Sequence, residues 1–232
     1  MLDKRDYKFP EEHNQDFRVL SKGLSAFADN KTCIDLGCGN GLYTKELAKY
    51  ARRTIAVDIN LENLRLAKKM NLRNTYFVVC DISCLPFKDG YFDFAISVEV
   101  LTHLDFPDMR NAFLELHRVL GPGSKALVTM HNRIRFVFHS LKHLKFPSAK
   151  YNTAGLPVYP VGAAYFKENL CKNRFVIAGS LKYLNFSNGF SWDTYSRKKI
   201  KSFFIIALEG LLTRLPLLRS LAITFGATIV KK

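Results

Sequence analysis

The residues with the clearest chemical meaning lie between Asp35 and Gly41, where the sequence reads DLGCGNG. Three glycines at alternate positions allow a sharp backbone turn and a close approach to a ligand, because no Cβ intervenes. The dinucleotide fingerprint GxGxxG needs its third glycine at position 42, where Leu42 stands, so the spacing disfavours NAD and FAD. No Gly-Lys-Ser/Thr follows, which excludes a phosphate-binding P-loop. A glycine loop alone is a weak signal, and the residues downstream decide its meaning.

Acidic residues also end the next two strand-like segments. A carboxylate at Asp58 can accept hydrogen bonds from both hydroxyls of an adenosine ribose, and it would repel a 2′-phosphate. Asp81 can accept from the exocyclic amine of adenine, while the backbone N–H of Ile82 donates to the ring. Each acid taken alone is more often a helix cap or a turn residue. Three acids at the ends of three successive strands, one of them opening a glycine loop, predict an adenosine site.

Two histidines are candidates for acid–base chemistry. His103 follows the fourth strand-like segment and His131 ends the fifth, and open parallel sheets bind ligands at that edge. Taken singly, each histidine more often has a structural hydrogen bond than a catalytic role. We favour His131 as the base of the two.

The elements that position these residues alternate along the chain. Strand-like segments separated by helical ones predict a parallel α/β sheet with helices on both faces, because right-handed crossovers must cover it. The expected strands are 32–36, 54–58, 75–80, 92–98 and 125–131, and the expected helices are 16–28, 41–50, 61–70 and 109–120. After His131 we expect an excursion over 132–160, a helix at 162–172, a strand at 175–186, a segment at 197–221 that is helical up to Pro216, and a last strand at 223–230.

This pattern predicts one domain over residues 1–232. We divide it into an N-terminal helical cap (1–30), a cofactor-binding core (31–131), an inserted lid (132–160) and a C-terminal part that completes the sheet (161–232). Aromatic and basic residues gather in the cap and the lid, which suits an apolar, anionic or ring-containing acceptor. A small basic cap with a core of its own explains that composition equally well.

The net charge of +15 is the unusual bulk property. It suits RNA, an acidic lipid surface or a phosphorylated small molecule, and a generally basic proteome would produce it as well. The five cysteines form no CxxC pair and no zinc-finger spacing, so we expect no metal, no disulfide framework and a cytoplasmic location. The chain start has no signal-peptide core. Ser202–Leu221 lacks the roughly 18 apolar residues that span a bilayer.

The segment from Cys33 to Gly41 resembles motif I of class I S-adenosylmethionine methyltransferases. Asp58 matches the ribose-binding acid of that family, and Asp81-Ile82 matches its adenine-binding pair. The resemblance covers about residues 32–131, and this motif set is specific.

Two further stretches resemble the small-molecule, ubiquinone-biosynthesis-like branch (the methyltransferase domain 11 type). They are the LPF and YFDFA sequences within residues 85–95 and the E..RVL.PG sequence from Glu115 to Gly123. Gly121 replaces the lysine usual in that branch and Ser124 replaces its second glycine, in a turn expected far from the cofactor.

This resemblance implies a Rossmann-like, doubly wound, seven-stranded sheet of order 3-2-1-4-5-7-6, with the last strand antiparallel. It also implies S-adenosyl-L-methionine as cofactor. The cofactor-binding residues that we predict on these grounds are Asp35, Gly37, Cys38, Gly39, Gly41, Asp58, Ile59, Asp81, Ile82 and Ser97.

Three functions follow from these observations. The first is methyl transfer to a small-molecule or lipid-precursor acceptor, which the branch resemblance favours. The second is RNA methylation, which only the basic charge supports, since Ser97-Val98-Glu99-Val100 stands where N-methylating nucleic-acid enzymes carry an acidic or amide tetrad. The third is a non-catalytic S-adenosylmethionine-binding module.

The segment Arg197–Leu221 combines basic and apolar residues, which suits contact with an anionic membrane surface or, more simply, packing on the sheet. The sequence leaves the oligomeric state undetermined.

Overall fold

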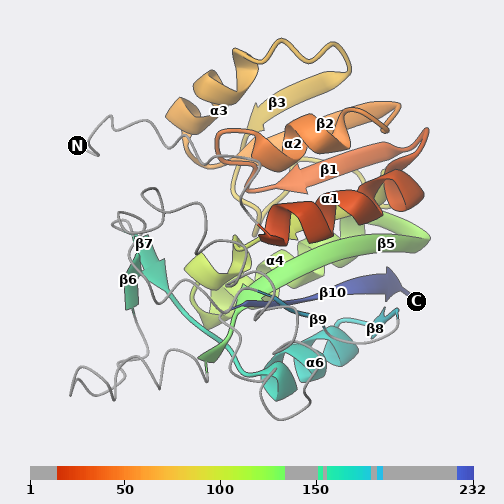
Figure 1. Cartoon of the computed structure of the whole chain (residues 1–232). Coiled ribbons are helices and arrows are strands. Elements are labelled where there is room, and N and C mark those ends of the chain that lie inside the picture. Colours follow the sequence, from red (N-terminus) through yellow and green to blue (C-terminus); the bar gives the residue numbers. More distant parts are fainter. Residues whose placement is uncertain (1–14, 134–150, 154–155, 179–181, 185–223) are drawn as a thin grey trace, which may run out of the picture.

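The computed structural model describes residues 15–133, 151–153, 156–178, 182–184 and 224–232. A central sheet lies between two layers of helices (Figure 1). Its strands are β1 Thr32–Leu36, β2 Arg53–Asp58, β3 Thr75–Val79, β4 Phe92–Val98, β5 Leu120–His131, β8 Phe175–Ile177, β9 Lys182–Leu184 and β10 Thr224–Lys231. They follow the order β3-β2-β1-β4-β5-β10-β8, and β9 also pairs with β10.

This topology confirms the predicted strand order. The first five strands are parallel, and β10, the last strand in the chain, runs antiparallel to β5. The predicted strand over 175–186 is divided between β8 and β9, which both pair with β10. In the register, Asp35 lies opposite Ala56 and Ile96, and Asp58 lies opposite Val79. The carboxyl ends of β1 to β4 therefore meet at one edge of the sheet.

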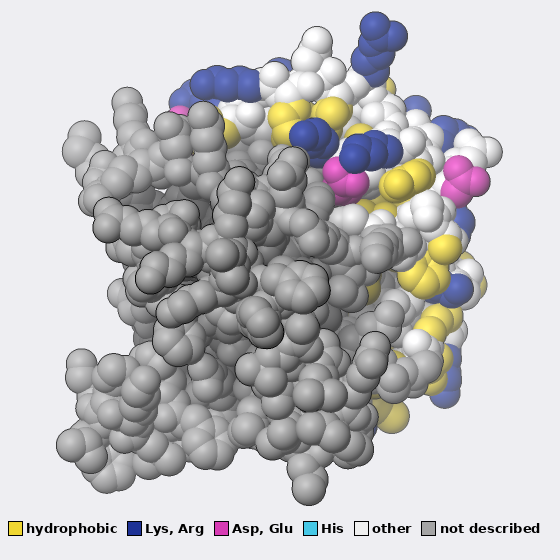
Figure 2. Space-filling view, viewed as in Figure 1, with side chains coloured by type: hydrophobic (Ala, Val, Ile, Leu, Met, Phe, Trp, Pro, Cys, Tyr) yellow, Lys and Arg dark blue, Asp and Glu magenta, His cyan; other side chains and the backbone are white. Residues whose placement is uncertain are grey.

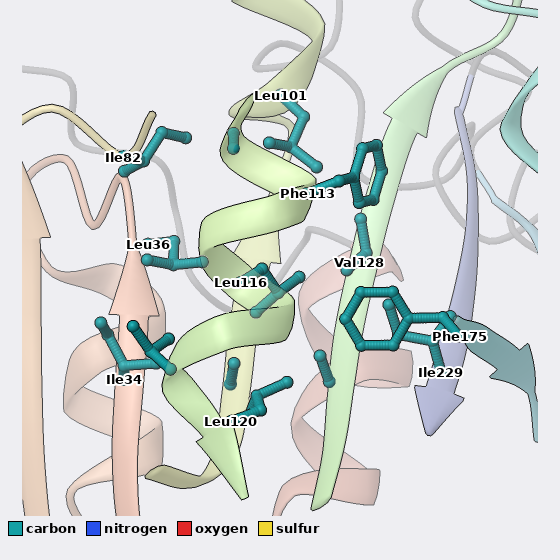
Figure 3. Packing of buried hydrophobic residues seen from close by; sticks show 14 of the residues in the cluster. Ile34, Leu36, Ile82, Leu101, Phe113, Leu116, Leu120, Val128, Phe175 and Ile229 are labelled. Carbon is teal, nitrogen blue, oxygen red and sulfur yellow. The ribbon is translucent and has the colours of Figure 1, made fainter. Parts of the chain in front are cut away.

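Helices cover both faces of the sheet because each carries a buried apolar side. On one face, Leu24 and Ala28 of α1 (Gln15–Ala28) pack with Leu47 of α2 (Leu42–Leu47) against Phe94 and Ile96. Helix α3 (Leu61–Lys68) lies on the same face, over Ala56. The opposite face is covered by α4 (Phe106–Val119) and α6 (Ala163–Lys172). Figure 3 shows Phe113 and Leu116 of α4 directed at Leu36 and Val128 of the sheet.

Helix α4 begins three residues before its predicted start at Met109. Asp105 accepts a hydrogen bond from the backbone N–H of Asp108 at 3.0 Å, and Pro107 stands in the first turn. Both are ordinary features of a helix N-terminus. The apolar periodicity begins later than the cap, which is why the pattern alone places the start too late.

Beyond His131, the structure describes part of the predicted lid. Strands β6 (Tyr151–Thr153) and β7 (Leu156–Val158) form a two-stranded antiparallel sheet. Residues 1–14 of the predicted cap, most of 132–160 and the predicted helix Arg197–Leu221 lie outside the described residues. The described part of the cap, α1, packs on the central sheet.

No helix in the described ranges is long and apolar enough to cross a membrane. On the described part of the face in Figure 2, Lys and Arg side chains stand among apolar and neutral ones and form no continuous patch. The basic character of the chain is thus dispersed over that visible surface.

Candidate functional site

The glycine loop joins β1 to α2, and its three glycines have different environments. All three have positive φ, at 69° for Gly37, 54° for Gly39 and 89° for Gly41. A Cβ at Gly37 would overlap Val100, and one at Gly41 would overlap Met70. A Cβ at Gly39 would meet no atom within 4 Å. Two glycines therefore serve packing within the protein, and Gly39 is the one whose backbone a ligand can approach.

Asp58 ends β2 and fastens this loop. One carboxylate oxygen, Oδ2, accepts the backbone N–H of Gly39 at 2.8 Å, and the other, Oδ1, accepts that of Asn60 at 2.8 Å. The residue is 8% exposed. Each carboxylate oxygen has a second lone pair, so both can still accept a ribose hydroxyl. The structure thus adds a second role to the predicted one, because Asp58 also holds Gly39 in place.

Asp35 lies beneath the loop and is almost fully buried. The hydroxyl of Thr44 donates to its carboxylate at 2.5 Å. Burial raises the pKa of Asp35 to about 7, the hydrogen bond from Thr44 opposes this rise, and the negative charge of Asp58 adds to it. Burial also raises the pKa of the neighbouring Cys38 thiol, aided by the charges of both acids. Cys38 is therefore a neutral thiol in the loop.

The predicted adenine side begins at Asp81. Its Oδ1 accepts hydrogen bonds from the backbone N–H of Ser83 at 2.8 Å and from the hydroxyl of Ser83 at 2.7 Å. Ile82 is buried, whereas Ile59, next to Asp58, is 71% exposed. Burial raises the pKa of Cys80 to about 11, and the charges of Asp81 and Asp58 contribute. The two acids therefore lie close together, with an exposed apolar side chain beside them.

Ser97 differs from the other predicted cofactor residues. It is 1% exposed, and its hydroxyl has no hydrogen-bond partner within the described ranges. Side chains alternate along a strand, so Ser97 shares the face of Ala95, which packs in the cluster that α4 covers. A role of Ser97 at the ligand edge would therefore use its backbone.

The two predicted histidines come together at the carboxyl ends of β4 and β5. Burial lowers the pKa of His131, the positive charge of His103 lowers it further, and the negative charge of Glu99 raises it. Glu99 has a φ of 59°, which is uncommon outside glycine, and its backbone N–H donates to the Thr129 hydroxyl at 2.9 Å. The sequence predicted Ser97 as a cofactor residue but indicated no role for Glu99. Position at a strand end was the available signal, because a positive φ at glutamate leaves no mark in the sequence.

Strand β7 and the residues that follow it contact this group. The Nδ1 atom of His103 lies 2.8 Å from the carbonyl oxygen of Pro157. The backbone N–H of Tyr159 donates to the Thr102 carbonyl at 2.7 Å, and that of Val161 donates to the His131 carbonyl at 3.1 Å. A carbonyl can only accept, so Nδ1 of His103 carries a proton, and Nε2 holds the lone pair when the ring is neutral.

In the part of the chain that the structure describes, no three His, Cys, Asp or Glu residues are placed to hold a metal ion.

Comparison with known proteins agrees with this geometry. Residues 34–128 match the methyltransferase domain family. The O-methyltransferase cnsE of Penicillium expansum is 32% identical over 107 residues, which are 44% of this chain and 38% of that protein. The ubiquinone/menaquinone biosynthesis C-methyltransferase UbiE of Burkholderia mallei is 34% identical over 110 residues, which are 44% of this chain and 43% of that protein. The matched region thus spans less than half the length of either curated relative.

A solved structure of an S-adenosylmethionine-dependent methyltransferase from Methanosarcina mazei has the same fold. Its TM-score is 0.62 at 21% identity, over 88% of this chain and 94% of that chain. The fold, which this chain shares with that methyltransferase, and the glycine loop with its acids agree with the predicted resemblance to class I S-adenosylmethionine-dependent methyltransferases. More particularly, the segment from Ile34 to Val128 matches the methyltransferase domain family, and this match supports S-adenosylmethionine as the cofactor.

The residues present fit this cofactor. S-adenosylmethionine carries positive charge on its sulfonium and on its amino group, and the loop is bordered by the carboxylates of Asp35 and Asp58. The open space at Gly39 permits close backbone approach. No lysine stands where a P-loop would use one on a phosphate, in keeping with a ligand that has none.

Proposed function

We propose that this protein transfers a methyl group from S-adenosylmethionine to a small-molecule acceptor. The observation that carries the proposal is the loop at Gly39, which is open to a ligand on one side and hydrogen-bonded to Asp58 on the other. A loop that served packing alone would have no need of open space at Gly39. The charge and position of the neighbouring acids suit a cationic adenosine compound.

In this proposal the cofactor residues divide by the part of the molecule they hold. Asp58 accepts from the ribose hydroxyls, Asp81 and the Ile82 backbone bind the adenine edge, and Ile59 covers an adenine face. The predicted methionine-end residues are Asp35, Gly37 and Gly39, with Cys38 and Gly41 in the same loop and the backbone at Ser97 near the methyl group. When bound, the cofactor supplies a methyl group on a positively charged sulfur. The protein then needs mainly to align the acceptor and exclude water, since orientation alone lowers such barriers by several kcal/mol.

A protic acceptor must also lose a proton. The sequence favours His131 as the base, but we now infer that His103 takes this proton, because the hydrogen bond to Pro157 leaves Nε2 with the lone pair. His131, with Glu99 beside it, is the second candidate, since that carboxylate would stabilise a protonated imidazole. The segment Pro157–Val161 is hydrogen-bonded to both histidines, to the side chain of His103 and to the backbone of His131.

Binding measurements and a transfer assay test this function. Calorimetry should show saturable binding of S-adenosylmethionine, comparable or tighter binding of S-adenosylhomocysteine, and no binding of NAD. Incubation with methyl-labelled cofactor and a pooled metabolite extract should then label a small molecule. Binding without any transfer would leave a non-catalytic module, and binding of NAD alone would overturn the proposal.

RNA methylation is the alternative that the +15 charge supports. It predicts RNA binding in which the logarithm of the binding constant falls linearly with the logarithm of the salt concentration. The slope is proportional to the number of phosphates contacted. The sequence after the fourth strand does not favour it, because Ser97-Val98-Glu99-Val100 stands where N-methylating nucleic-acid enzymes carry an acidic or amide tetrad. Methyl transfer to RNA in the same labelled assay would establish it instead.

We further propose a cytoplasmic location and contact of Arg197–Leu221 with anionic lipid, although that segment lies outside the described residues. Basic flanks beside an apolar face contribute about 1 kcal/mol per cation near an anionic surface. Co-sedimentation with phosphatidylserine vesicles should appear at low salt and weaken when Phe203 and Phe204 become serine. No sedimentation at low salt would leave the packed-helix interpretation and direct the acceptor search toward soluble metabolites.

A further inference from the structure

Arg118 of α4 uses every donor of its guanidinium group within the protein. The residue comes from the RVL sequence near the end of the helix, some 30 positions after the loop that it contacts. The five N–H bonds reach the Glu115 carboxylate twice (2.7 Å each), the carbonyls of Leu85 (2.9 Å) and Phe87 (2.6 Å), and the Asp89 carboxylate (2.8 Å). Such a complete set fixes the planar group in one orientation.

Glu115 completes the arrangement from the same helix. Its Oε2 accepts the backbone N–H of Leu85 at 2.7 Å in addition to its bonds from Arg118. The hydrogen bonds from Arg118 and Leu85 lower the pKa of Glu115, so it stays ionised at neutral pH. The Arg118 carbonyl also accepts the N–H of Gly90 at 2.9 Å. Residues 85–90 are therefore attached to α4 at five points, and we call this arrangement the Arg118 clamp.

The Arg118 clamp influences the position of Asp81, because only a short turn separates Asp81 from the clamped residues. Asp81 follows β3, which is paired with β2, and the N–H of Cys84 closes the turn on the Asp81 carbonyl at 3.1 Å. Leu85 comes next and is already held by Glu115. Ile82 lies buried between these two anchors, facing α4 in Figure 3. The Asp81–Cys84 turn is thus fixed at both ends, one of which depends on Arg118.

We propose that Arg118 and Glu115 are positioning residues for adenine recognition, acting through the Asp81–Cys84 turn. This rests on the proposed function, in which Asp81 binds the exocyclic amine of adenine. Without the clamp, residues 85–90 lose their attachment, and the Asp81 carboxylate and the Ile82 N–H no longer keep their relative position. Lysine at 118 keeps the charge but offers three donors in place of five, so it cannot reproduce the clamp.

The test compares two ligands that differ at the adenine amine. S-adenosylhomocysteine carries the amine, whereas S-inosylhomocysteine has a carbonyl there. The wild-type protein should prefer the first, and Asp81→Asn should remove most of that preference. In Arg118→Lys and in Glu115→Gln the preference should fall about fivefold, as expected when one net hydrogen bond is lost. Arg110→Lys, at an exposed site on the same helix, should leave it unchanged.

A purely structural clamp would give a different result. It would lower the melting temperature of Arg118→Lys while leaving the ratio of the two affinities at its wild-type value, and that outcome would overturn the inference. Failure of the proposed cofactor site looks different again, because the wild-type protein would then bind neither ligand or show no preference. Affinities measured well below each variant's melting temperature separate these cases.

Discussion

The proposed cofactor end and the proposed acceptor end of the site are built in different ways. At the cofactor end, Asp35 and Asp58 lie on two adjacent strands within 24 positions of each other, Gly39 lies in the loop after the first of them, and hydrogen bonds join that loop to the second. At the acceptor end, His103 is held by Pro157, some 50 positions away in the chain. The first is assembled from local sequence, and the second requires distant segments to meet.

Because the two ends are built differently, they also differ in how freely their residues can change. The cofactor is the same for every enzyme of this class, so a compact and self-contained loop suits it. The proposed acceptor end depends on the segment Pro157–Val161, which lies outside the regular alternation of strands and helices over residues 32–131. Substitutions at the two ends should therefore affect different steps, and the expected effects below are arranged from the largest to the smallest.

Substitution of His103 should have the largest effect. In His103→Gln we expect kcat to fall by roughly 10²- to 10⁴-fold, the usual contribution of a general base. Cofactor affinity should remain at the wild-type value, because His103 belongs to the acceptor end. Steady-state kinetics with the acceptor found in the extract assay, together with calorimetry of S-adenosylhomocysteine, measure both quantities.

His117→Gln is the matched control, since His117 lies on α4 against Phe175, on another part of the molecule. Its kcat should equal that of the wild type. If His131→Gln loses activity while His103→Gln keeps it, the base is His131, and the Pro157 hydrogen bond has a structural role only.

Gly39→Val should abolish cofactor binding while the protein stays folded. Its side chain would occupy the open space and block backbone approach, so we expect affinity to fall by about 100-fold or more. A φ of 54° also costs a side chain about 1–2 kcal/mol of folding stability. Calorimetry and thermal unfolding report the two effects separately.

Gly123→Val tests whether strain alone explains that loss. Gly123 has a φ of 72°, and nothing lies within 4 Å of a Cβ there, but it stands in the first part of β5, where the pairing with β4 shifts register, away from the glycine loop. It should lose similar stability and keep its cofactor affinity. Equal affinity in Gly39→Val and the wild type would mean that the loop is not the ligand site.

Asp58→Ala should weaken cofactor binding by about 1–3 kcal/mol, because two ribose hydroxyls lose their acceptor. It should also lower stability, since the Gly39 and Asn60 N–H groups lose their partner. Asp105→Ala, which removes the cap of α4, provides the contrast: a stability loss of about 0.5–2 kcal/mol with unchanged affinity. An affinity loss of the same size in both variants would assign the effect to folding.

The same contrast explains how much the sequence predicted. The strands and the glycine loop could be predicted because buried parallel strands are rich in apolar residues and Gly37, Gly39 and Gly41 lie close together in the chain. The strand order was predicted from the family resemblance. The boundary at α4 was placed late because Asp105 caps the helix before the apolar repeat begins. The division into β8 and β9 could not be predicted, since it depends on how both pair with β10.

Within the site, the sequence identified residue types but not their contacts. It named Asp58 for a ligand, whereas the structure shows that the same carboxylate also holds Gly39. It matched Glu115 and Arg118 to a motif without assigning them a role, because their partners lie 30 positions away. The hydrogen bond from His103 to Pro157 depends on a segment with no regular pattern, so no periodicity could have indicated it.

The smallest expected effect is a pH dependence of cofactor affinity that originates in Asp35. Burial raises its pKa to about 7 in the ligand-free protein, so the folded state holds a proton that the unfolded chain has released above its ordinary pKa of 3.8. As pH rises from there to about 7, the folded state binds more protons than the unfolded state, and the contribution of this group to the free energy of unfolding decreases. A bound cationic ligand has the opposite effect on Asp35, because it favours the ionised carboxylate over the protonated one. Binding of S-adenosylmethionine should therefore release a proton below pH 7.

Affinity should accordingly rise with pH up to about 7 and then level off, with a loss of about tenfold per pH unit below that point as the limiting slope. Calorimetry at pH 6 in two buffers of different ionisation enthalpy measures the released proton directly. Asp35→Asn keeps an acceptor for the Thr44 hydroxyl but cannot ionise, so its affinity should be lower at pH 8 and independent of pH between 6 and 8.

S-adenosylhomocysteine lacks the sulfonium charge and keeps the amino group, so its pH dependence reports which charge Asp35 senses. If the affinity of S-adenosylhomocysteine depends on pH as strongly as that of S-adenosylmethionine, Asp35 senses the amino group. If its affinity does not depend on pH, Asp35 senses the sulfonium. A slope in Asp35→Asn equal to that of the wild type would place the titrating group elsewhere.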